Sequence, residues 1–572
     1  MNDVKKLYKL WKEKAVLDGD LIKELAEIEN DSEQISDIFY KNLQFGTAGL
    51  RGIIGAGTNR MNVYTIGQAT QGLAEYLNSE FKEPSVAIAY DSRIKSELFA
   101  REAASVLAAN AVQVHIFPRL VPTPMLSYAV RTLGCSSGII ITASHNPSRY
   151  NGFKCYDKSG YQMTDEAAQK TFDYISKVDV FEQVKRVSFE DAVEGGTIKF
   201  IGEQVFNGFY EEVLSKRLNK DASEKTKLKI IYTPLNGAGN LPVRKILGEI
   251  GIKELKVVES QENPDGNFPT CPYPNPEIRQ SFEEALKITD SFNADLLLAT
   301  DPDCDRVGIA VLDEGEYRLM TGNETGAMLT EYILSQMSEM CILPENAIVI
   351  KSIVSTPLIE EIARNYKASV VDLLTGFKYV GEYITALENK GEKHRFVFAM
   401  EESYGYLSGT HARDKDAVTA SMLICEMAAY YKAKGLTLYD FMNSIYEKYG
   451  FYISLLNNYA FEGAKGMQTM GKIMSDLRSS PPMEINGGRV KTIKDYKTGE
   501  VLNCNSNEKT STDLPSSDVL HFILESEDTV IVRPSGTEPK LKVYITSKAE
   551  SREKAEKKAQ DISDRMKRIL GI

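Results

Sequence analysis

The segment Asp295–Arg306, DLLLATDPDCDR, joins a short apolar run to a loop that carries three aspartates. A short apolar run bounded by polar residues is typical of a buried strand, so we expect a strand over Asp295–Ala299. The same order of strand and polar loop recurs in VAIA before YDSR, GIII before TASHNP, RFVFA before MEESYG and TVIV before RPSGTE. Because ligand groups gather at the carboxyl ends of strands in α/β folds, we predict that these loops meet in a cleft between domains.

Helical patterns alternate with the short apolar runs along the whole chain. We expect helices over Glu97–Leu107, Pro276–Asp290 and Leu358–Tyr366. The further strands that we expect are Val86–Ala89, Gly138–Ile141, Leu228–Tyr232, Ala347–Ile350, Arg395–Ala399 and Thr529–Val532. This alternation is typical of βαβ units with buried, partly parallel sheets, and 572 residues are enough for three to five domains.

The two ends of the chain are predicted to be helical. Val4, Leu7, Leu10 and Trp11 have helical spacing, so we expect the start of the chain to be a helix packed on the body. The last helix is expected over Ala549–Leu570, with Ile562, Met566 and Ile569 facing inward. Residues 479–518 are rich in Ser, Pro, Asn and Gly, which indicates loops with short strand-like pieces between them.

Composition and charge exclude several classes of protein. The net charge is −12, which argues against coating nucleic acid or an anionic membrane. No stretch approaches the ~20 apolar residues of a membrane span. The seven cysteines are scattered and form no CxxC, which fits reduced thiols better than disulfides or a zinc site. We therefore expect a cytoplasmic α/β protein with no nucleic-acid or membrane partner.

Asp301, Asp303 and Asp305 are the candidate metal ligands. In an extended segment alternate side chains project to the same side, so their three carboxylates could converge on one hard cation. The loop is not an EF-hand, because Arg306 and Leu312 stand where that motif has Gly and Glu. The alternative is a cluster of Asx turns that caps the next element. Carboxylates without His or Cys partners favour Mg²⁺ over zinc.

Ser144, in TASHNP, is a candidate exposed nucleophile at the end of a buried strand. The segment lacks the GxSxG elbow of hydrolases, and His145 is adjacent in sequence, so it is not obviously placed as a base. The alternative is a serine and an asparagine that cap a turn.

Three more loops have groups that suit phosphate or sugar. Arg533-Pro534-Ser535-Gly536-Thr537 offers a guanidinium, hydroxyls and free backbone N–H groups for a phosphate. Glu401-Glu402-Ser403-Tyr404-Gly405 offers acceptors for sugar hydroxyls, and Gly46–Gly52 is a glycine-rich loop with one arginine. Each could be a simple turn. No Walker A or complete dinucleotide motif occurs. Together the loops suggest an anionic sugar ligand, a divalent ion and phosphoryl transfer through a phosphoserine.

TASHNP, TDPDCDR, EESYG and RPSGTEPKLK, in this order, resemble the α-D-phosphohexomutase superfamily from Phe45 to the C-terminus. The long form with FGTAGLRG resembles the branch that holds bacterial α-phosphoglucomutases and phosphopentomutases. This resemblance implies four domains around a central cleft, three similar α/β domains with mixed sheets and a C-terminal α+β domain. We place an N-terminal extension at 1–40 and the four domains at 41–205, 206–321, 322–454 and 455–572.

The resemblance also implies roles for individual residues. Ser144 would be phosphorylated and, with Asp301, Asp303 and Asp305, would hold Mg²⁺. Arg51 and His145 would line the phosphoserine, and Lys154 would be the general acid/base or only a phosphate ligand. The implied substrate-binding residues are Glu401, Ser403, Thr375, Gly376, Lys378, Lys415, Arg533, Ser535, Gly536 and Thr537.

The implied reaction interconverts glucose 1-phosphate and glucose 6-phosphate through glucose 1,6-bisphosphate, in a monomer or homodimer. Alternatives are a phosphopentomutase, a phosphomannomutase, a glucose 1,6-bisphosphate synthase and a non-catalytic sugar-phosphate sensor. Two departures from the family pattern are Cys304 in place of a small residue and Met400 in place of Gly. Tyr404-Gly405 resembles phosphoglucomutases, which favours glucose as the sugar.

Overall fold

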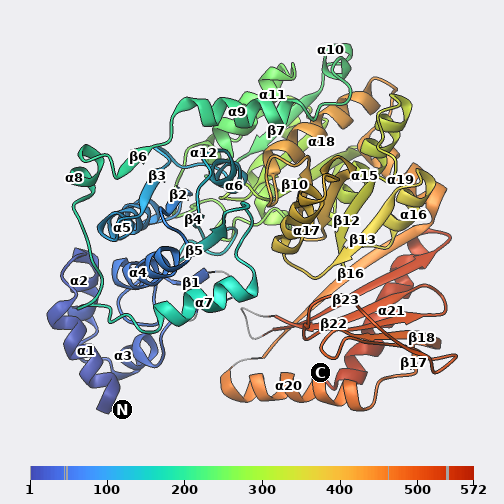
Figure 1. Cartoon of the computed structure of the whole chain (residues 1–572). Helices are drawn as coiled ribbons and strands as arrows, with labels where there is room; N and C mark the ends of the chain where they lie inside the picture. The colour runs from blue at the N-terminus through green and yellow to red at the C-terminus, as the bar shows by residue number, and fades with distance from the viewer. Residues whose placement is uncertain (1, 44, 47–48, 462, 536–539) are drawn as a thin grey trace. The chain divides into compact units, whose positions relative to one another are not determined.

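The computed structural model describes residues 2–43, 45–46, 49–461, 463–535 and 540–572 (Figure 1). Contacts within the chain define two compact units. The first holds Met1–Thr325, Phe377–Ala399 and Ser403–Leu438, and the second holds Gly326–Gly376, Met400–Glu402 and Tyr439–Ile572.

Three helices begin the first unit: α1 (Asn2–Lys14), α2 (Gly19–Glu27) and α3 (Ser32–Phe39). The carboxylates of Asp18 and Asp31 cap α2 and α3 by accepting hydrogen bonds from backbone N–H groups. Trp11 is 1 % exposed and meets three aromatic rings edge-on or nearly so, with ring centroids between 5.3 and 5.8 Å away. The predicted packed helix is confirmed, but Leu10 is exposed, so its predicted inward position is wrong.

The first sheet has six strands in the order β1-β5-β4-β2-β3-β6. Their bounds are Gly49–Ile53, Tyr150–Asp157, Ser137–Ile141, Ser85–Tyr90, Gln113–Ile116 and Ile198–Phe200. Strands β4, β2, β3 and β6 run parallel, whereas β5 is antiparallel to β4 and to β1. The carboxyl ends of β2 and β4 therefore lie side by side, and the loops YDSR and TASHNP leave the sheet at the same edge.

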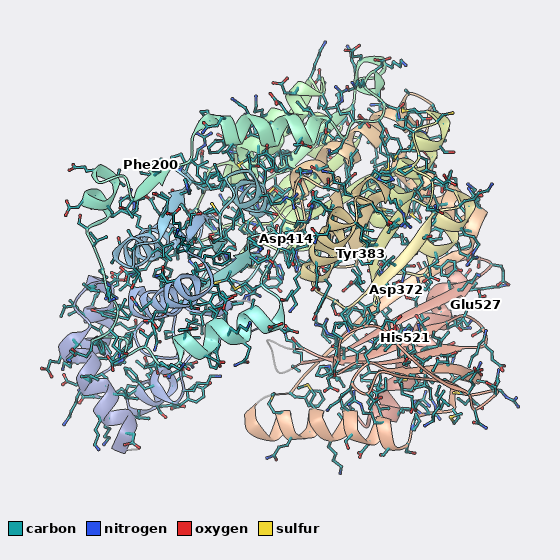
Figure 2. All side chains as sticks on the ribbon, viewed as in Figure 1. Phe200, Asp372, Tyr383, Asp414, His521 and Glu527 are labelled. Atoms are coloured by element: carbon teal, nitrogen blue, oxygen red, sulfur yellow. The ribbon has the colours of Figure 1, made fainter. Side chains whose placement is uncertain are left out.

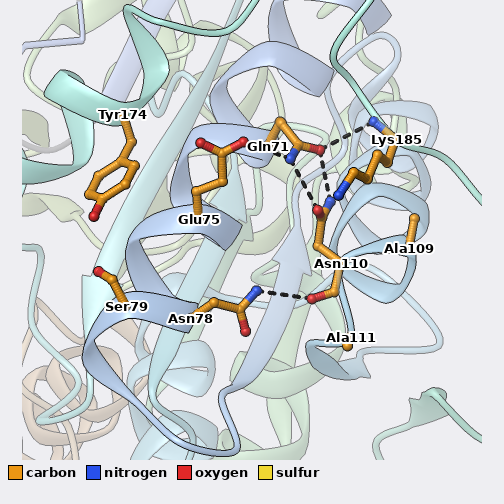
Figure 3. Close-up of a pocket in the computed structure, with 9 residues that line it drawn as sticks. All are labelled: Gln71, Glu75, Asn78, Ser79, Ala109, Asn110, Ala111, Tyr174 and Lys185. Carbon is orange, nitrogen blue, oxygen red and sulfur yellow. Dashed lines mark hydrogen bonds between the residues drawn. The ribbon is translucent and has the colours of Figure 1, made fainter.

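Five helices accompany this sheet: α4 (Val63–Glu80), α5 (Ser96–Ala109), α6 (Thr123–Thr132), α7 (Asp165–Ile175) and α8 (Phe189–Glu194). A depression of about 640 Å³ lies over α4, the end of α5 and Tyr174 of α7 (Figure 3). Gln71 and Asn110 exchange two side-chain hydrogen bonds there, of 3.0 and 2.8 Å. These amides are engaged in holding α4 against α5.

The second sheet has the order β11-β10-β9-β7-β8, with β10 antiparallel to its neighbours. Its strands are Glu316–Leu319, Val307–Asp313, Leu296–Thr300, Lys229–Thr233 and Glu254–Val257. The helices around it include α9 (Glu203–Leu214), α10 (Ala222–Lys225), α11 (Asn240–Glu249) and α12 (Glu259–Glu262). Here β9 leads into the three-aspartate loop and β10 leaves it.

The predicted helix Pro276–Asp290 is wrong as a continuous element. The segment forms η1 (Arg279–Phe282), α13 (Glu283–Leu286) and α14 (Thr289–Phe292). The hydroxyls of Ser281 and Thr289 donate to backbone carbonyls, which competes with a regular helix. Pro276 also packs so closely on Gly308 that a Cβ there would lie 2.5 Å from its carbonyl oxygen.

The first unit also contains α17 (Phe377–Asn389), η2 (Lys393–Arg395), β15 (Gly405–Ser408) and α18 (Ala417–Lys432). Three elements contain residues of both units: α15 (Gly322–Glu339), β14 (Phe396–Glu401) and α19 (Leu438–Tyr449). The buried α18 begins at Asp416, whose carboxylate accepts from the N–H groups of Val418 and Thr419.

The second unit begins with the parallel pair β12 (Ile348–Ser352) and β13 (Ser369–Leu373), with α16 (Leu358–Asn365) between them. It continues through α19 (Leu438–Tyr449) to an antiparallel C-terminal sheet of order β16-β23-β22-β21-β18-β19-β20. The strands of this sheet are Phe451–Ala460, Lys540–Ala549, Thr529–Pro534, Leu520–Leu524, Gly488–Asp495, Glu500–Asn503 and Lys509–Ser511, with β17 (Glu484–Ile485) paired to β18.

Two helices, α20 (Gly463–Ser479) and α21 (Arg552–Leu570), share a hydrophobic core with this sheet. Ile562 and Met566 are buried in it and Ile569 is half-buried, which confirms the predicted inward face of the last helix. The strand-like pieces expected within residues 479–518 are β17 to β20. Among the described residues, no helix is long and apolar enough to cross a membrane.

We expect Trp11→Ala to lower the free energy of unfolding by about 3–5 kcal/mol, because a fully buried indole leaves a cavity. The measurement is urea unfolding followed by circular dichroism, compared at the first transition because a chain of several domains unfolds in steps. Leu10→Ala on the exposed side of α1 is the control and should cost less than about 1 kcal/mol. Equal first transitions for the two variants would contradict the packing described for α1.

Candidate active site

The loop after β9 folds as a tight turn that gathers three buried carboxylates. Cys304 has φ of 49°, and one oxygen of Asp301 accepts from the N–H groups of Asp305 and Arg306, at 3.1 and 3.0 Å. The prediction of an extended segment is therefore wrong. The predicted convergence nevertheless occurs, because carboxylate oxygens of Asp301, Asp303 and Asp305 lie within 4.8 Å of one another.

Two lysines neutralise part of this negative charge. Lys154 on β5 places its Nζ 3.0 Å from Asp303, and Lys415 places its Nζ 2.9 Å from Asp305. All three carboxylates are at most 1 % exposed. The loop after β9, strand β5 and the segment before α18 thus meet at one charged centre.

Burial and mutual repulsion separate the pKa values of the three aspartates. Burial, followed by the charges of Asp303 and Asp305, raises the pKa of Asp301 well above its usual value. Burial also acts to raise the pKa of Asp303, but the charge of Lys154 and the hydrogen bonds from Asp301 and Lys154 outweigh it and bring that pKa far below the usual range. Burial raises the pKa of Asp305. Burial and mutual repulsion therefore disfavour the fully charged form of this cluster in the absence of further positive charge.

The three-aspartate cluster has the chemistry of a divalent-cation site. Among the described residues, no hydrogen-bond donor reaches the buried Oδ1 atoms of Asp303 and Asp305. Oxygen-only ligands suit a hard cation such as Mg²⁺, and such an ion would supply acceptors of this kind with positive charge. The residues present therefore fit a bound divalent metal ion.

Ser144 lies directly against the cluster. Its Oγ donates to Oδ2 of Asp301 at 2.7 Å, and its backbone has φ of 51°, a left-handed conformation that is uncommon outside glycine. The side chain is buried, with 4 % of the residue exposed, so the prediction of an exposed nucleophile is wrong. The loop of the second sheet covers the position from which Ser144 would otherwise face solvent.

His145 and Arg51 also contact this loop. Nδ1 of His145 lies 3.2 Å from Oγ of Ser144, which is closer than sequence adjacency suggested. Burial, and then the positive charges of Arg306 and Arg51, hold the pKa of His145 well below its usual value, so its ring is neutral near pH 7. Arg51, on β1, donates to the side chain of Asn146 at 3.2 Å.

The predicted sugar loop, Glu401–Gly405, has residues in both units, and each part has contacts within its own unit. In the first unit, the carbonyl of Tyr404 accepts from N–H of Val307 at 3.1 Å, which places this loop beside the metal loop. Ser403 is half-buried. In the second unit, Glu401 accepts from N–H of Gly376 at 2.7 Å, which brings two predicted binding residues together.

The remaining predicted binding residues that the structure describes have contacts away from the three-aspartate cluster or are half-buried. Lys378 donates to Asp165 at 2.6 Å, at the start of α7, rather than to the three-aspartate cluster. Thr375 is half-buried. Arg533 lies on β22, and N–H of Ser535 donates to the carbonyl of Lys540 at 2.7 Å. Gly536 and Thr537 lie outside the described residues.

Sequence reasoning missed a buried network behind Lys415. Asp414, labelled in Figure 2, accepts from Nζ of Lys415 at 3.0 Å and from the hydroxyl of Tyr156 at 2.6 Å. Tyr156 lies two residues after Lys154 on β5. Lys415 is therefore linked to the strand that carries Lys154, through Asp414 and Tyr156. The charges of Arg413-Asp414-Lys415-Asp416 were visible in the sequence, but the tyrosine 258 residues away was not.

Sequence models of one family match most of the chain. The phosphoglucomutase/phosphomannomutase alpha/beta/alpha domains I, II and III match residues 42–180, 207–315 and 321–449, and the C-terminal domain matches residues 508–565. The predicted four-domain class is thereby confirmed. The domain bounds at 205, 321 and 454 stay predictions.

A phosphoglucomutase of Staphylococcus aureus (strain USA300) is 36 % identical over 541 residues, which cover 94 % of this chain and 95 % of that protein. A phosphoglucomutase (pp63/parafusin) from Paramecium is similar in structure, with a TM-score of 0.69 at 16 % identity over 93 % of this chain and 97 % of that one. A putative phosphomannomutase from Thermus thermophilus has a TM-score of 0.68 at 20 % identity, covering 93 % of this chain and 100 % of that one. These matches and the buried serine beside three aspartates agree with the resemblance seen in the sequence: the chain belongs to the phosphoglucomutase/phosphomannomutase family.

Proposed function

We propose that this chain is a phosphoglucomutase, an isomerase that interconverts glucose 1-phosphate and glucose 6-phosphate with Ser144 as the carrier of the phosphoryl group. The observation that carries the proposal is the 2.7 Å hydrogen bond between Oγ of Ser144 and Asp301, within a buried cluster that fits a divalent cation. The phosphoglucomutase that is 36 % identical over nearly the whole chain supports the same activity.

The proposed reaction has two transfers. In the first, the bond between Oγ of Ser144 and phosphorus breaks while the 6-hydroxyl of glucose 1-phosphate bonds to phosphorus, which yields glucose 1,6-bisphosphate. The proton of the 6-hydroxyl must be taken up by a base, and Oγ of Ser144 must gain a proton as it leaves. Lys154 is the candidate base in its neutral amine form, and phosphate binding as an ammonium is its alternative role. In the second, Oγ of Ser144 bonds to the phosphorus on C1 while the bond between that phosphorus and the C1 oxygen breaks. The proton of the serine hydroxyl passes to the C1 oxygen, and glucose 6-phosphate leaves.

The residues around Ser144 suit this transfer. Asp301, Asp303, Asp305 and an oxygen on Ser144 would hold Mg²⁺, which supplies positive charge to the oxygens of a transferring phosphoryl group. Arg51 contacts the same loop and can add a guanidinium to those oxygens. Because Ser144 is buried, water has little access to its phosphoryl group, which favours a sugar hydroxyl as acceptor.

We assign the sugar hydroxyls and the phosphate that is not transferred to the other predicted binding residues. We assign the sugar hydroxyls to Glu401 and Ser403, with Thr375, Gly376, Lys378 and Lys415 as further binding residues. The phosphate that is not transferred is assigned to Arg533, Ser535, Gly536 and Thr537. Glucose 1,6-bisphosphate is the proposed activator, and we propose a cytoplasmic monomer or homodimer without nucleic-acid or membrane partners.

The test of the substrate compares kcat/KM for glucose 1-phosphate, mannose 1-phosphate and ribose 1-phosphate, with Mg²⁺ and a trace of glucose 1,6-bisphosphate. We expect glucose 1-phosphate to be preferred at least tenfold, which is about 1.4 kcal/mol of transition-state discrimination. If ribose 1-phosphate is preferred, the sugar and the role given to Glu401 and Ser403 are wrong, while the phosphoserine chemistry stands.

Replacing the nucleophile tests the covalent step. We expect Ser144→Ala to lower kcat at least about a thousandfold, because Oγ of Ser144 is the proposed carrier of the phosphoryl group. Binding of glucose 6-phosphate, measured by calorimetry, should stay within about threefold of the unmodified protein. Mass spectrometry should find one added phosphoryl group on Ser144 of the original protein after incubation with glucose 1,6-bisphosphate.

The control for that experiment is Ser137→Ala, at the opposite end of β4, where the hydroxyl donates to the carbonyl of Tyr156. It should keep its turnover. Persistent turnover and phosphoryl uptake in Ser144→Ala would remove Ser144 from the reaction.

The metal site is tested without measuring activity. Mg²⁺ at a hundred times its dissociation constant should stabilise the protein by about 2.7 kcal/mol, because it binds the folded three-aspartate cluster. Asp303→Asn should show a much smaller rise in melting temperature. Asp313→Asn is the control, because that carboxylate lies on β10 and pairs with Arg318. Equal Mg²⁺-induced shifts for Asp303→Asn and Asp313→Asn would place the ion elsewhere.

A further inference from the structure

Arg93 lies beneath the loop that carries Ser144. It belongs to YDSR after β2, and its guanidinium is buried, with 3 % of the residue exposed. It donates to the carbonyl of Ser144 through Nε and Nη2, and to the carbonyls of Asn146, Pro147 and Tyr150 through Nη2 and Nη1. One planar group thus fixes four carbonyls of a seven-residue stretch of backbone.

Asp91 holds the same loop from the other side of Ser144. Its Oδ2 accepts from Oγ1 of Thr142 at 2.6 Å, and that Oγ1 accepts from N–H of Ser144 at 2.8 Å. Asp91 also accepts from N–H of Arg93 at 2.9 Å, and the two side chains approach to 3.5 Å. Both backbone polar groups of Ser144 are therefore held, directly or through Thr142, by Arg93 and Asp91.

The second sheet's loops close over this pair. The ring of Phe268 lies 5.1 Å from the guanidinium carbon of Arg93. A Cβ on Gly266 would lie 2.4 Å from the backbone nitrogen of Ile94, so only glycine permits this close approach. With solvent excluded, the hydrogen bonds of Arg93 meet little competition from water.

The conformation of Ser144 requires such support. A serine with φ of 51° is strained, and strained backbone persists only where the surroundings over-determine it. If the residue relaxed to an ordinary conformation, its Oγ would leave the 2.7 Å contact with Asp301. The contacts of Arg93 and of Thr142 oppose that relaxation on opposite sides of the residue.

We propose that Arg93 and Asp91 are positioning residues for phosphoryl transfer, a buried brace that keeps Ser144 in its left-handed conformation with Oγ directed at Asp301. The brace touches neither substrate nor metal. The expected effect of the brace on catalysis rests on the proposed role of Ser144. Its effect on the conformation of the loop is independent of that role. Lysine cannot replace Arg93, because one ammonium lacks the planar fork that reaches four carbonyls.

The test is Arg93→Lys in the full-length protein, read by hydrogen exchange and by kinetics. Peptides that cover residues 142–150 should exchange at least tenfold faster, while peptides from β7 should be unchanged. With glucose 1-phosphate, kcat should fall about a hundredfold, because a displacement of about 1 Å at the reacting atom has such an effect. KM should change less than about threefold, since Arg93 holds the nucleophile and not the sugar.

Thr142→Val provides a milder variant should Arg93→Lys fail to fold. It removes the hydroxyl between Asp91 and N–H of Ser144, and it should show the same faster exchange and the same fall in kcat at constant KM. The matched control is Arg186→Lys, a half-buried arginine of the same domain that pairs with Glu102 and does not contact the loop. It should change neither quantity.

The results separate the brace from the proposed activity. Unchanged exchange over residues 142–150 in a folded Arg93→Lys or Thr142→Val variant overturns the brace. Faster exchange with kcat within twofold of the original overturns its catalytic part. If the original protein does not convert glucose 1-phosphate, the proposed function fails, and hydrogen exchange alone decides whether Arg93 holds the loop.

Discussion

Three carboxylates buried within 4.8 Å of one another are the constraint on which the first unit depends. Charges removed from water destabilise a fold unless hydrogen bonds or opposite charges compensate them. Here Lys154 comes from β5, Lys415 from the segment before α18 and the hydroxyl of Ser144 from the loop after β4. The compensation therefore ties together elements that lie far apart in the sequence, and loss of any one weakens the compensation of this buried charge.

The same balance explains why the cluster is chemically competent. Two ammonium groups offset three carboxylates only in part, and burial with the remaining repulsion raises the pKa of Asp301. A divalent cation would supply the missing charge. The Oδ1 atoms of Asp303 and Asp305, which accept no hydrogen bond from the described residues, are suitable ligands for it. The residues that stabilise the fold without an ion are thus the ones that would face an ion and a phosphate together.

The sequence predicts the strands better than the geometry of the loops between them. Runs such as Gly138–Ile141 are short, apolar and flanked by polar residues, so local pattern is enough. The loop at Asp301 was expected to be extended, but a left-handed residue at Cys304 and two N–H groups that converge on Asp301 make it a turn. The convergence of the three carboxylates was predicted, but from an alternation of side chains in an extended segment that this turn does not have.

Long-range pairing limits what the sequence can reveal of the site. Lys378 meets Asp165, and Asp414 meets Tyr156, across more than 200 residues, and no local pattern indicates either pair. The burial of Ser144 has the same origin, since a loop of the second sheet covers a strand end of the first. The predicted Pro276–Asp290 helix failed for a local reason as well, because the hydroxyls of Ser281 and Thr289 bond nearby backbone carbonyls.

The proposed phosphoryl transfer also requires that Ser144 be shielded from water. In a site that activates the phosphoryl group of a phosphoserine, water could compete with the sugar hydroxyl as acceptor, so excluding water favours transfer to the sugar. Ser144 is 4 % exposed, and the ring of His145 and the buried pair Asp91 and Arg93 contact its loop. A loop held so rigidly leaves the nucleophile one direction in which to react, toward Asp301 and whatever the cluster binds.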